Sequence, residues 1–423
     1  TRTPGGRACL DGGIAVPGEG ALRPREPGPL RSRITGVLAF HQSYQALSGP
    51  RRPQGGRSLA DRWGASPFMG SGGSAFARRR YQCPRAGRRG GRARFGRAEE
   101  GGVHGRQIKM IVEDHQYNPQ KAVVAAKKLI EKDQVFCLYN VIGTSPCEAI
   151  RPLLAETGTP LIAPATQSGS MSDLSRMAGD LIFHTDTGYD KQTNILGDYI
   201  LNIDSNAKIG LIYQDDDYGA NVLKGAAEVE ERTGVSIQKE AYQRGATDFA
   251  GQVGNLIKGG ATHVIIAGVV KEPIIVMKTA AAMGYAPQFY GTSPTMDHRV
   301  ALAAGPAGEG FIAANFAYLW NSDAPEAVHY RELCAKNEVP EAYMGMYHFY
   351  GYITAKVLVE GLKRAGKNPT RQRLVNGLET LKKWDSGAFP PITYNSKDHA
   401  GNESVILVQV NEGVQTVISD WID

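Results

Sequence analysis

The segment Val135-Phe-Cys-Leu-Tyr-Asn-Val-Ile-Gly-Thr-Ser-Pro146 is the most informative part of this sequence about its fold. Its first eight residues form a near-continuous apolar run, which is typical of a strand buried on both faces. The residues that follow predict a turn and a helix over 146–157, with Ser145 as N-cap and Glu148 completing a capping box. Free N–H groups at the start of this helix would face the crevice and could hold a carboxylate. A well-capped helix without a ligand fits the same residues.

Working outward from this stretch, strands and helices alternate along the chain, which predicts parallel sheets built from βαβ units. Further strands are expected at 107–112, 160–163, 208–213, 235–240, 263–268, 288–291 and 311–316, and helices at 119–132, 189–202, 219–233, 247–258 and 272–284. Three more helices, at 325–337, 342–365 and 370–382, precede an antiparallel pair at 404–410 and 414–421. So many strands predict an α/β protein of two doubly wound lobes.

Small polar residues follow several of these strands, where open α/β sheets bind ligands. The tetrapeptide Gly-Thr-Ser-Pro ends a strand twice, at 143–146 and at 291–294, and Thr166, Gln167 and Ser168 follow a third strand. The acidic run 215–217 is explained by the dipole of the next helix, so we expect no metal there, whereas Tyr218 is placed to line a pocket.

The basic character of the chain belongs to its first hundred residues. The formal net charge is +6, but residues 1–100 hold 19 arginines, no lysine and six acidic residues. The richest part, 85–97, superficially resembles an Arg-Gly nucleic-acid-binding arm. Arginine without lysine is instead what a GC-rich coding sequence yields when it is read out of frame. We therefore expect 1–98 to be disordered or out of frame, and no nucleic-acid partner.

Catalytic motifs are absent from the sequence, and this favours a binding protein over an enzyme. The nine histidines show no pair at metal-ligand spacing, so neither a metal nor another cofactor is expected. The five cysteines are an odd number without CxxC spacing. Cys137 and Cys147 could form a bridge or remain buried free thiols, and the sequence leaves their redox state open.

The run Ile111-Val-Glu-Asp-His-Gln-Tyr-Asn-Pro-Gln-Lys-Ala-Val-Val-Ala-Ala-Lys-Lys-Leu-Ile130, with Leu161-Ile-Ala-Pro-Ala-Thr166 after it, resembles the leucine/isoleucine/valine-binding family. These are type I periplasmic solute-binding proteins of ABC importers, and the resemblance covers about 99–423. It implies two Rossmann-like lobes that close on a ligand, joined by three hinge crossings near 185–189, 315–318 and 387–391. The first lobe would comprise 99–187 with 317–387, and the second 188–316 with 388–423.

The resemblance also implies the residues of the ligand site. Hydroxyl and N–H groups of the first lobe would hold a carboxylate, a second-lobe tyrosine (Tyr218) would close on the ligand, and a late helix would add Tyr343 or Tyr347. The first-lobe positions are Gly143, Thr144, Ser145, Ala165, Thr166, Gln167 and Ser168.

Two of the family's site positions are changed in this sequence. Val269 stands where the family has an aromatic residue, and Ser293 stands where it has the acid that grips an ammonium group. An unpaired ammonium in a closed site is costly, so the ligand could be a carboxylate or amide without an α-amino group. Asp297 or Glu272 could replace the missing acid, so an amino acid stays possible.

The start of the chain departs from the family as well. The family begins with a central strand and a long helix, whereas here only an Ala-Leu-Ser-Gly-Pro echo within 34–50 is found. We therefore expect the first strand and helix to be missing or scrambled, which would leave a gap in the first sheet.

The function we expect is capture of a small ligand in the periplasm and delivery to an ABC permease by a monomeric, exported protein, although no signal peptide is readable. The alternatives are a cytoplasmic ligand-sensing regulator of the amide-sensor type and an α/β enzyme acting on a small acid.

Overall fold

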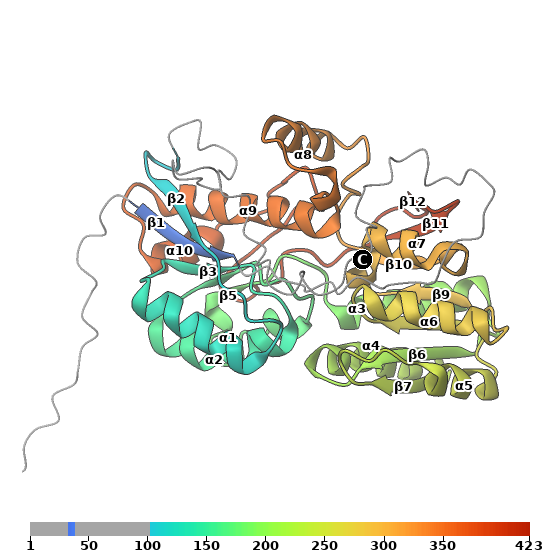
Figure 1. The fold of residues 1–423 in the computed structure, drawn as a ribbon. Helices are drawn as coiled ribbons and strands as arrows, with labels where there is room; N and C mark the ends of the chain where they lie inside the picture. Colours follow the sequence, from blue (N-terminus) through green and yellow to red (C-terminus); the bar gives the residue numbers. More distant parts are fainter. Residues whose placement is uncertain (1–32, 39–101) are drawn as a thin grey trace, which may run out of the picture.

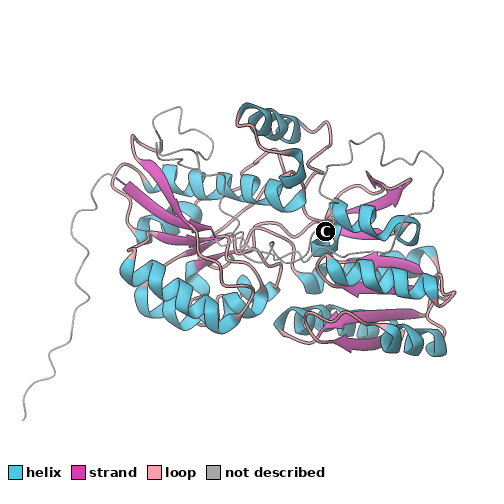
Figure 2. Cartoon of the chain, in the orientation of Figure 1, coloured by secondary structure: helices cyan, strands magenta, loops and turns pink. Residues whose placement is uncertain are grey.

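The computed structural model describes residues 33–38 and 102–423, and it consists of two α/β lobes side by side (Figure 1). Each lobe has a sheet of its own flanked by helices, as Figure 2 shows. This is the predicted fold class. None of the described helices is long and apolar enough to cross a membrane.

The sheet of the first lobe has five parallel strands in the order β2-β1-β3-β4-β5. They are β1 (Arg33–Leu38), β2 (Gln107–Ile111), β3 (Cys137–Tyr139), β4 (Leu161–Ile162) and β5 (Ile182–Phe183). The strand expected over 135–142 is thus much shorter, because the chain turns away at Asn140, which has a positive φ of 54°.

The expected gap in the first sheet is wrong, because β1 occupies that position. Thr35 lies level with Lys109 on one side, and Val37 lies level with Leu138 on the other. Without this strand the facing edges of β2 and β3 would leave their N–H and C=O groups unpaired. Residues 1–32 and 39–101, where disorder and a missing helix were expected, lie outside the described residues.

Helices cover both faces of the first sheet (Figure 1). On one face lie α1 (Pro119–Lys127), which continues as the π-helix η3 (Lys128–Lys132), and α2 (Thr144–Thr157). On the other lie α9 (Met346–Ala365) and α10 (Arg371–Leu378), and α8 (Pro325–Lys336) packs on α9. Leu138 packs under α1 and α2, and its neighbour Tyr139 packs under α9, as the alternation of a strand requires.

The sheet of the second lobe has seven strands in the order β12-β11-β10-β9-β8-β6-β7. The parallel strands are β6 (Ile209–Gln214), β7 (Gln238–Tyr242), β8 (His263–Ala267), β9 (Gln288–Gly291) and β10 (Ile312–Asn315). The antiparallel pair, which was predicted, is β11 (Ile406–Asn411) and β12 (Val414–Val417). One face is covered by α3 (Tyr189–Ile203) and α4 (Asp217–Thr233), the other by α5 (Ala250–Gly259), α6 (Lys271–Ala282) and α7 (His298–Ala304).

The chain passes between the lobes after β5, after β10 and after α10. The third passage was expected near 387–391, yet Ala388, Phe389 and Ile392 are buried in the core of the first lobe. Residues 399–401 run beside the first passage instead, where the His184 N–H donates to the His399 carbonyl at 3.0 Å. We therefore propose that the first lobe extends to about residue 401.

Candidate ligand-binding site

The first half of the site is the turn that leads from β3 into α2. The helix begins at Thr144, and its N-cap is Gly143 with a φ of 92°. The predicted capping box is therefore wrong: Ser145 already lies inside the helix. Glu148 does not cap it but pairs with Arg151 and Arg176, at 2.9 Å each. Because Gly143 adopts a positive φ, the helix begins at Thr144, earlier than it would with Ser145 as the N-cap.

A hydrogen bond joins this turn to the loop after β4. The hydroxyls of Thr144 and Thr166 lie 2.7 Å apart, and the Gly143 N–H donates to the Ala165 carbonyl at 3.0 Å. Both threonines are buried. The two groups of residues that the resemblance placed in one site are thus brought together, at the N-terminus of a helix that favours an anion.

Gln167 and Ser168 are tied to neighbouring protein groups. The Gln167 amide donates to Asp186 at 3.0 Å, and the Ser168 hydroxyl lies 2.8 Å from that of Ser170. Asp186 is buried in the first passage between the lobes and also accepts a hydrogen bond from Tyr350 at 2.7 Å. Burial raises the pKa of the Asp186 carboxyl to about 7.

The second half of the site is a pair of buried tyrosines. Tyr218 lies in the first turn of α4, and its hydroxyl is 2.6 Å from the Thr292 hydroxyl and donates to the Gly268 carbonyl at 3.2 Å. Its ring lies 4.4 Å from that of Tyr189, measured between centroids. The Tyr189 N–H donates to the Gln167 carbonyl at 2.5 Å, so the backbone connects this pair to the loop after β4 in the first lobe.

Ser293, in the second Gly-Thr-Ser-Pro turn, is fully buried. Its N–H donates to the Gln192 side chain at 2.8 Å, while its hydroxyl has no hydrogen-bond partner in the protein. A buried hydroxyl without a partner is costly, and a ligand would satisfy it.

The two acids that could replace the missing carboxylate both accept hydrogen bonds from other protein groups. Asp297 is fully buried and accepts from Arg299 Nε at 2.6 Å and Nη2 at 2.5 Å. Glu272 accepts the Val269 N–H at 3.2 Å. Val269 itself is half-buried and packs against the core of the second lobe.

Of the two tyrosines proposed on the late helix, only Tyr347 reaches the Ser293 turn. Its hydroxyl donates to the Pro294 carbonyl at 2.9 Å. Tyr343 lies in a short 3-10 turn before the helix and is 51% exposed.

Sequence reasoning missed Tyr117 and Arg244, although both lie at this site. The Tyr117 ring covers Gly143, where a Cβ would come within 2.5 Å of its Cε2 atom. The guanidinium carbon of Arg244 lies 3.5 Å from the centroid of that ring. The signal that could have revealed Tyr117 is its place in the loop that leaves the first predicted strand, beside the other strand ends.

The described residues contain no cluster suited to a metal ion. Within 33–38 and 102–423, no group of three or more His, Cys, Asp or Glu side chains could hold a metal ion. Cys137 and Cys147 are buried free thiols, which answers the question that the sequence left open.

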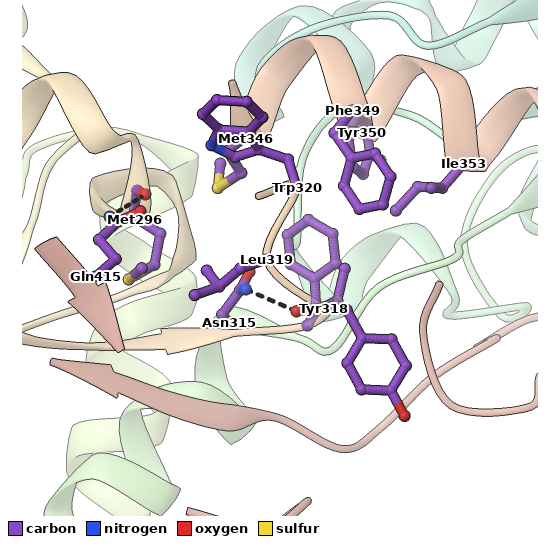
Figure 3. A pocket seen from close by; sticks show the side chains of 12 residues that line it. Met296, Asn315, Tyr318, Leu319, Trp320, Met346, Phe349, Tyr350, Ile353 and Gln415 are labelled. Atoms are coloured by element: carbon purple, nitrogen blue, oxygen red, sulfur yellow. Dashed lines mark hydrogen bonds between the residues drawn. The ribbon is translucent and has the colours of Figure 1, made fainter. Parts of the chain in front are cut away.

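A small cavity lies next to the site, at the second passage between the lobes (Figure 3). It measures about 10 Å³, which is room for roughly one water molecule, and it is lined largely by apolar side chains such as Phe316, Phe349 and Ile353. None of the proposed ligand-binding residues lines it.

Comparisons with known proteins agree with this architecture. The profile of a family described as periplasmic binding protein matches residues 84–415. The leucine-, isoleucine-, valine-, threonine- and alanine-binding protein of Pseudomonas aeruginosa is 23% identical over 268 residues, which are 63% of this chain and 70% of that protein.

Solved structures show the same fold. A branched-chain amino acid ABC transporter protein from Thermus thermophilus with bound valine has a TM-score of 0.71 and 20% identity, covering 77% of this chain and 87% of that one. A fatty acid ABC transporter substrate-binding protein from Thermomonospora curvata has a TM-score of 0.69 and 21% identity, with coverages of 77% and 84%.

Proposed function

Because this chain belongs to the periplasmic binding protein family, we propose that it captures a small ligand between its lobes and delivers it to an ABC permease. The observation that supports this most is the meeting of polar groups from both lobes. In the first lobe the hydroxyls of Thr144 and Thr166 meet, and the next residue of that loop, Gln167, accepts the N–H of Tyr189, whose ring lies beside that of Tyr218 in the second lobe. Closure around such groups removes the ligand from water and strengthens each hydrogen bond to it.

The ligand we propose is an aromatic or aliphatic carboxylate, or an amide, without an α-amino group. The first lobe offers hydroxyls and a helix N-terminus to a carboxylate. The second lobe offers the buried Ser293 hydroxyl where an ammonium would need an acid. Asp297 is already paired with Arg299, and Glu272 accepts a backbone N–H. Burying an ammonium without a partner would cost a few kcal/mol.

The names of the relatives allow either class of ligand. The Pseudomonas protein is named for amino acids and the Thermomonospora protein for a fatty acid. These proteins are named as binding proteins, which supports a role without turnover. A periplasmic location and a permease partner are part of the same proposal.

A thermal-shift screen of the full chain tests the ligand class. Benzoate, hexanoate, benzamide, L-valine and L-leucine are added at equal concentrations, and each hit is checked for chemical turnover. A ligand at a hundred times its Kd stabilises the folded state by about 2.7 kcal/mol. We expect a shift with a carboxylate or the amide and none with the amino acids. Stabilisation by the amino acids alone would contradict the proposed class, and product formation would point to an enzyme.

A further inference from the structure

Tyr117 and Arg244 lie on different lobes and meet at the edge of the site. Tyr117 belongs to the loop between β2 and α1 of the first lobe, and Arg244 to the loop between β7 and α5 of the second. The guanidinium carbon lies 3.5 Å from the centroid of the tyrosine ring. This is a cation–π contact, in which the positive charge is attracted to the negative face of the ring.

A hydrogen bond within the second lobe helps to hold the guanidinium over the ring. Its acceptor is Gln214, at the end of β6. Arg244 Nη1 donates to Gln214 Oε1 at 3.4 Å. Burial raises the pKa of the Tyr117 hydroxyl, so the phenol stays neutral at physiological pH. The first lobe thus contributes one ring, and the second lobe contributes a guanidinium that is held over the face of that ring.

The backbone places Tyr117 in this position at a cost. Gln116 and Tyr117 are consecutive residues with φ values of 53° and 54°, a backbone conformation that residues other than glycine rarely adopt. Asn118 ends the strained segment by capping α1, because its side chain accepts the Lys121 N–H at 2.9 Å. The hydrogen bond from the Gln116 N–H to Asp114 at 2.8 Å and the contacts of the Tyr117 side chain together offset such strain.

The ring also covers the turn that begins α2. It packs on Gly143, directly above the helix N-terminus to which we assign the ligand carboxylate. The Tyr117 phenol lies near Tyr189 and Tyr218. A negative charge on it would raise the pKa of both hydroxyls. A ligand carboxylate held at this helix N-terminus would therefore lie beneath the Tyr117 ring.

We propose that Tyr117 and Arg244 form a latch that holds the lobes together and delays release of the ligand. The inference rests on the proposed closure of the two lobes, but it does not depend on which ligand they enclose. It predicts that part of the population is closed even without ligand, because the latch joins protein groups only.

The test measures lobe closure without ligand, so its outcome is separate from that of the ligand screen. Spin labels are attached at Val124→Cys on α1 and Ile257→Cys on α5, which are 70% and 38% exposed. Cys9 and Cys83 are replaced by Ser, while the buried Cys137, Cys147 and Cys334 remain. Pulsed electron paramagnetic resonance then measures the distances between the two labels, and the ratio of short to long distances gives the closed-to-open ratio.

Arg244→Ala is expected to lower the closed-to-open ratio about 2- to 5-fold, the worth of an exposed cation–π pair. Tyr117→Leu should lower it at least as much, and the double variant no further than Tyr117→Leu. Arg232→Ala, an exposed arginine of α4 that pairs with Asp198, is the matched control. The latch is refuted if Arg244→Ala behaves like the control, if the two substitutions add, or if the unliganded wild type shows long distances only.

Discussion

At the level of single residues, the buried hydroxyl of Ser293 is the polar group that a ligand would most clearly satisfy. It is fully buried and has no partner in the protein, whereas nearby hydroxyls such as those of Thr144 and Thr292 are paired. An unsatisfied buried polar group costs about 1–3 kcal/mol, which a bound ligand would recover.

Ser293→Ala should therefore weaken ligand binding without lowering the stability of the unliganded protein. The free energy of unfolding without ligand should stay equal or rise by up to about 1 kcal/mol, because the unpaired oxygen is removed. The affinity for the carboxylate or amide should fall roughly tenfold, the worth of one hydrogen bond. Urea unfolding and calorimetry measure the two quantities, and an unchanged Kd would remove Ser293 from the site.

Asp186 should make stability depend on pH. Its pKa is raised by burial to about 7 from an ordinary value of 3.8, so between pH 4 and 7 the folded state holds a proton that the unfolded state has lost. The free energy of unfolding therefore falls as pH rises through this window, by at most about 4 kcal/mol. Asp186→Asn should flatten the profile and stabilise the protein most at pH 8. The exposed Asp198→Asn is the control, and equal slopes in wild type and Asp186→Asn would contradict the expectation.

At the scale of elements, hydrophobic periodicity predicted the long helices and buried strands well. It missed β5, which has two residues, and α7, which has seven, because such short segments carry no readable period. It missed β1 because the surrounding tract is dominated by arginine and glycine, although Arg33–Leu38 contains Ile34, Thr35 and Val37.

The candidate site was predictable in part. The neighbouring strand ends and the family resemblance indicated the threonine pair and Tyr218. Tyr117 and Arg244 meet only because the lobes bring two distant loops together, and a local sequence pattern holds no information on that contact. The capping box failed because the φ of Gly143, which ends the turn, is not visible in the sequence.

Gly143→Ala tests the turn between β3 and α2. Its φ of 92° suits glycine only, and a methyl group would push into the Tyr117 ring. We expect a loss of about 1–3 kcal/mol in the free energy of unfolding. Gly251→Ala in α5, where a Cβ meets nothing within 4 Å, should be neutral or slightly stabilising. Equal melting temperatures for the two variants would contradict this account of the turn.

At the level of the whole molecule, part of the basic tract 1–100 belongs to the fold. Its arginines make residues 1–100 strongly positive, while the remainder of the chain is acidic by seven charges. Yet β1 comes from this tract and lies between β2 and β3 in the first sheet. The tract is thus structural at this one segment.

Truncation measures the contribution of β1. A chain that begins at residue 33 keeps the strand, and one that begins at residue 102 loses it. The second should show a separate, earlier melting transition for the first lobe, because β2 and β3 then carry unpaired edges. Identical melting curves by circular dichroism would show that β1 adds nothing to stability.

The central claim is that one small ligand without an ammonium group is enclosed between the lobes. Calorimetric titration of the full chain with benzoate tests it most directly, with L-leucine as the comparison. We predict one site per chain for benzoate, a negative heat-capacity change from closure over an apolar ring, and no heat with L-leucine. Binding of L-leucine at one site per chain, with none of benzoate, would contradict the account.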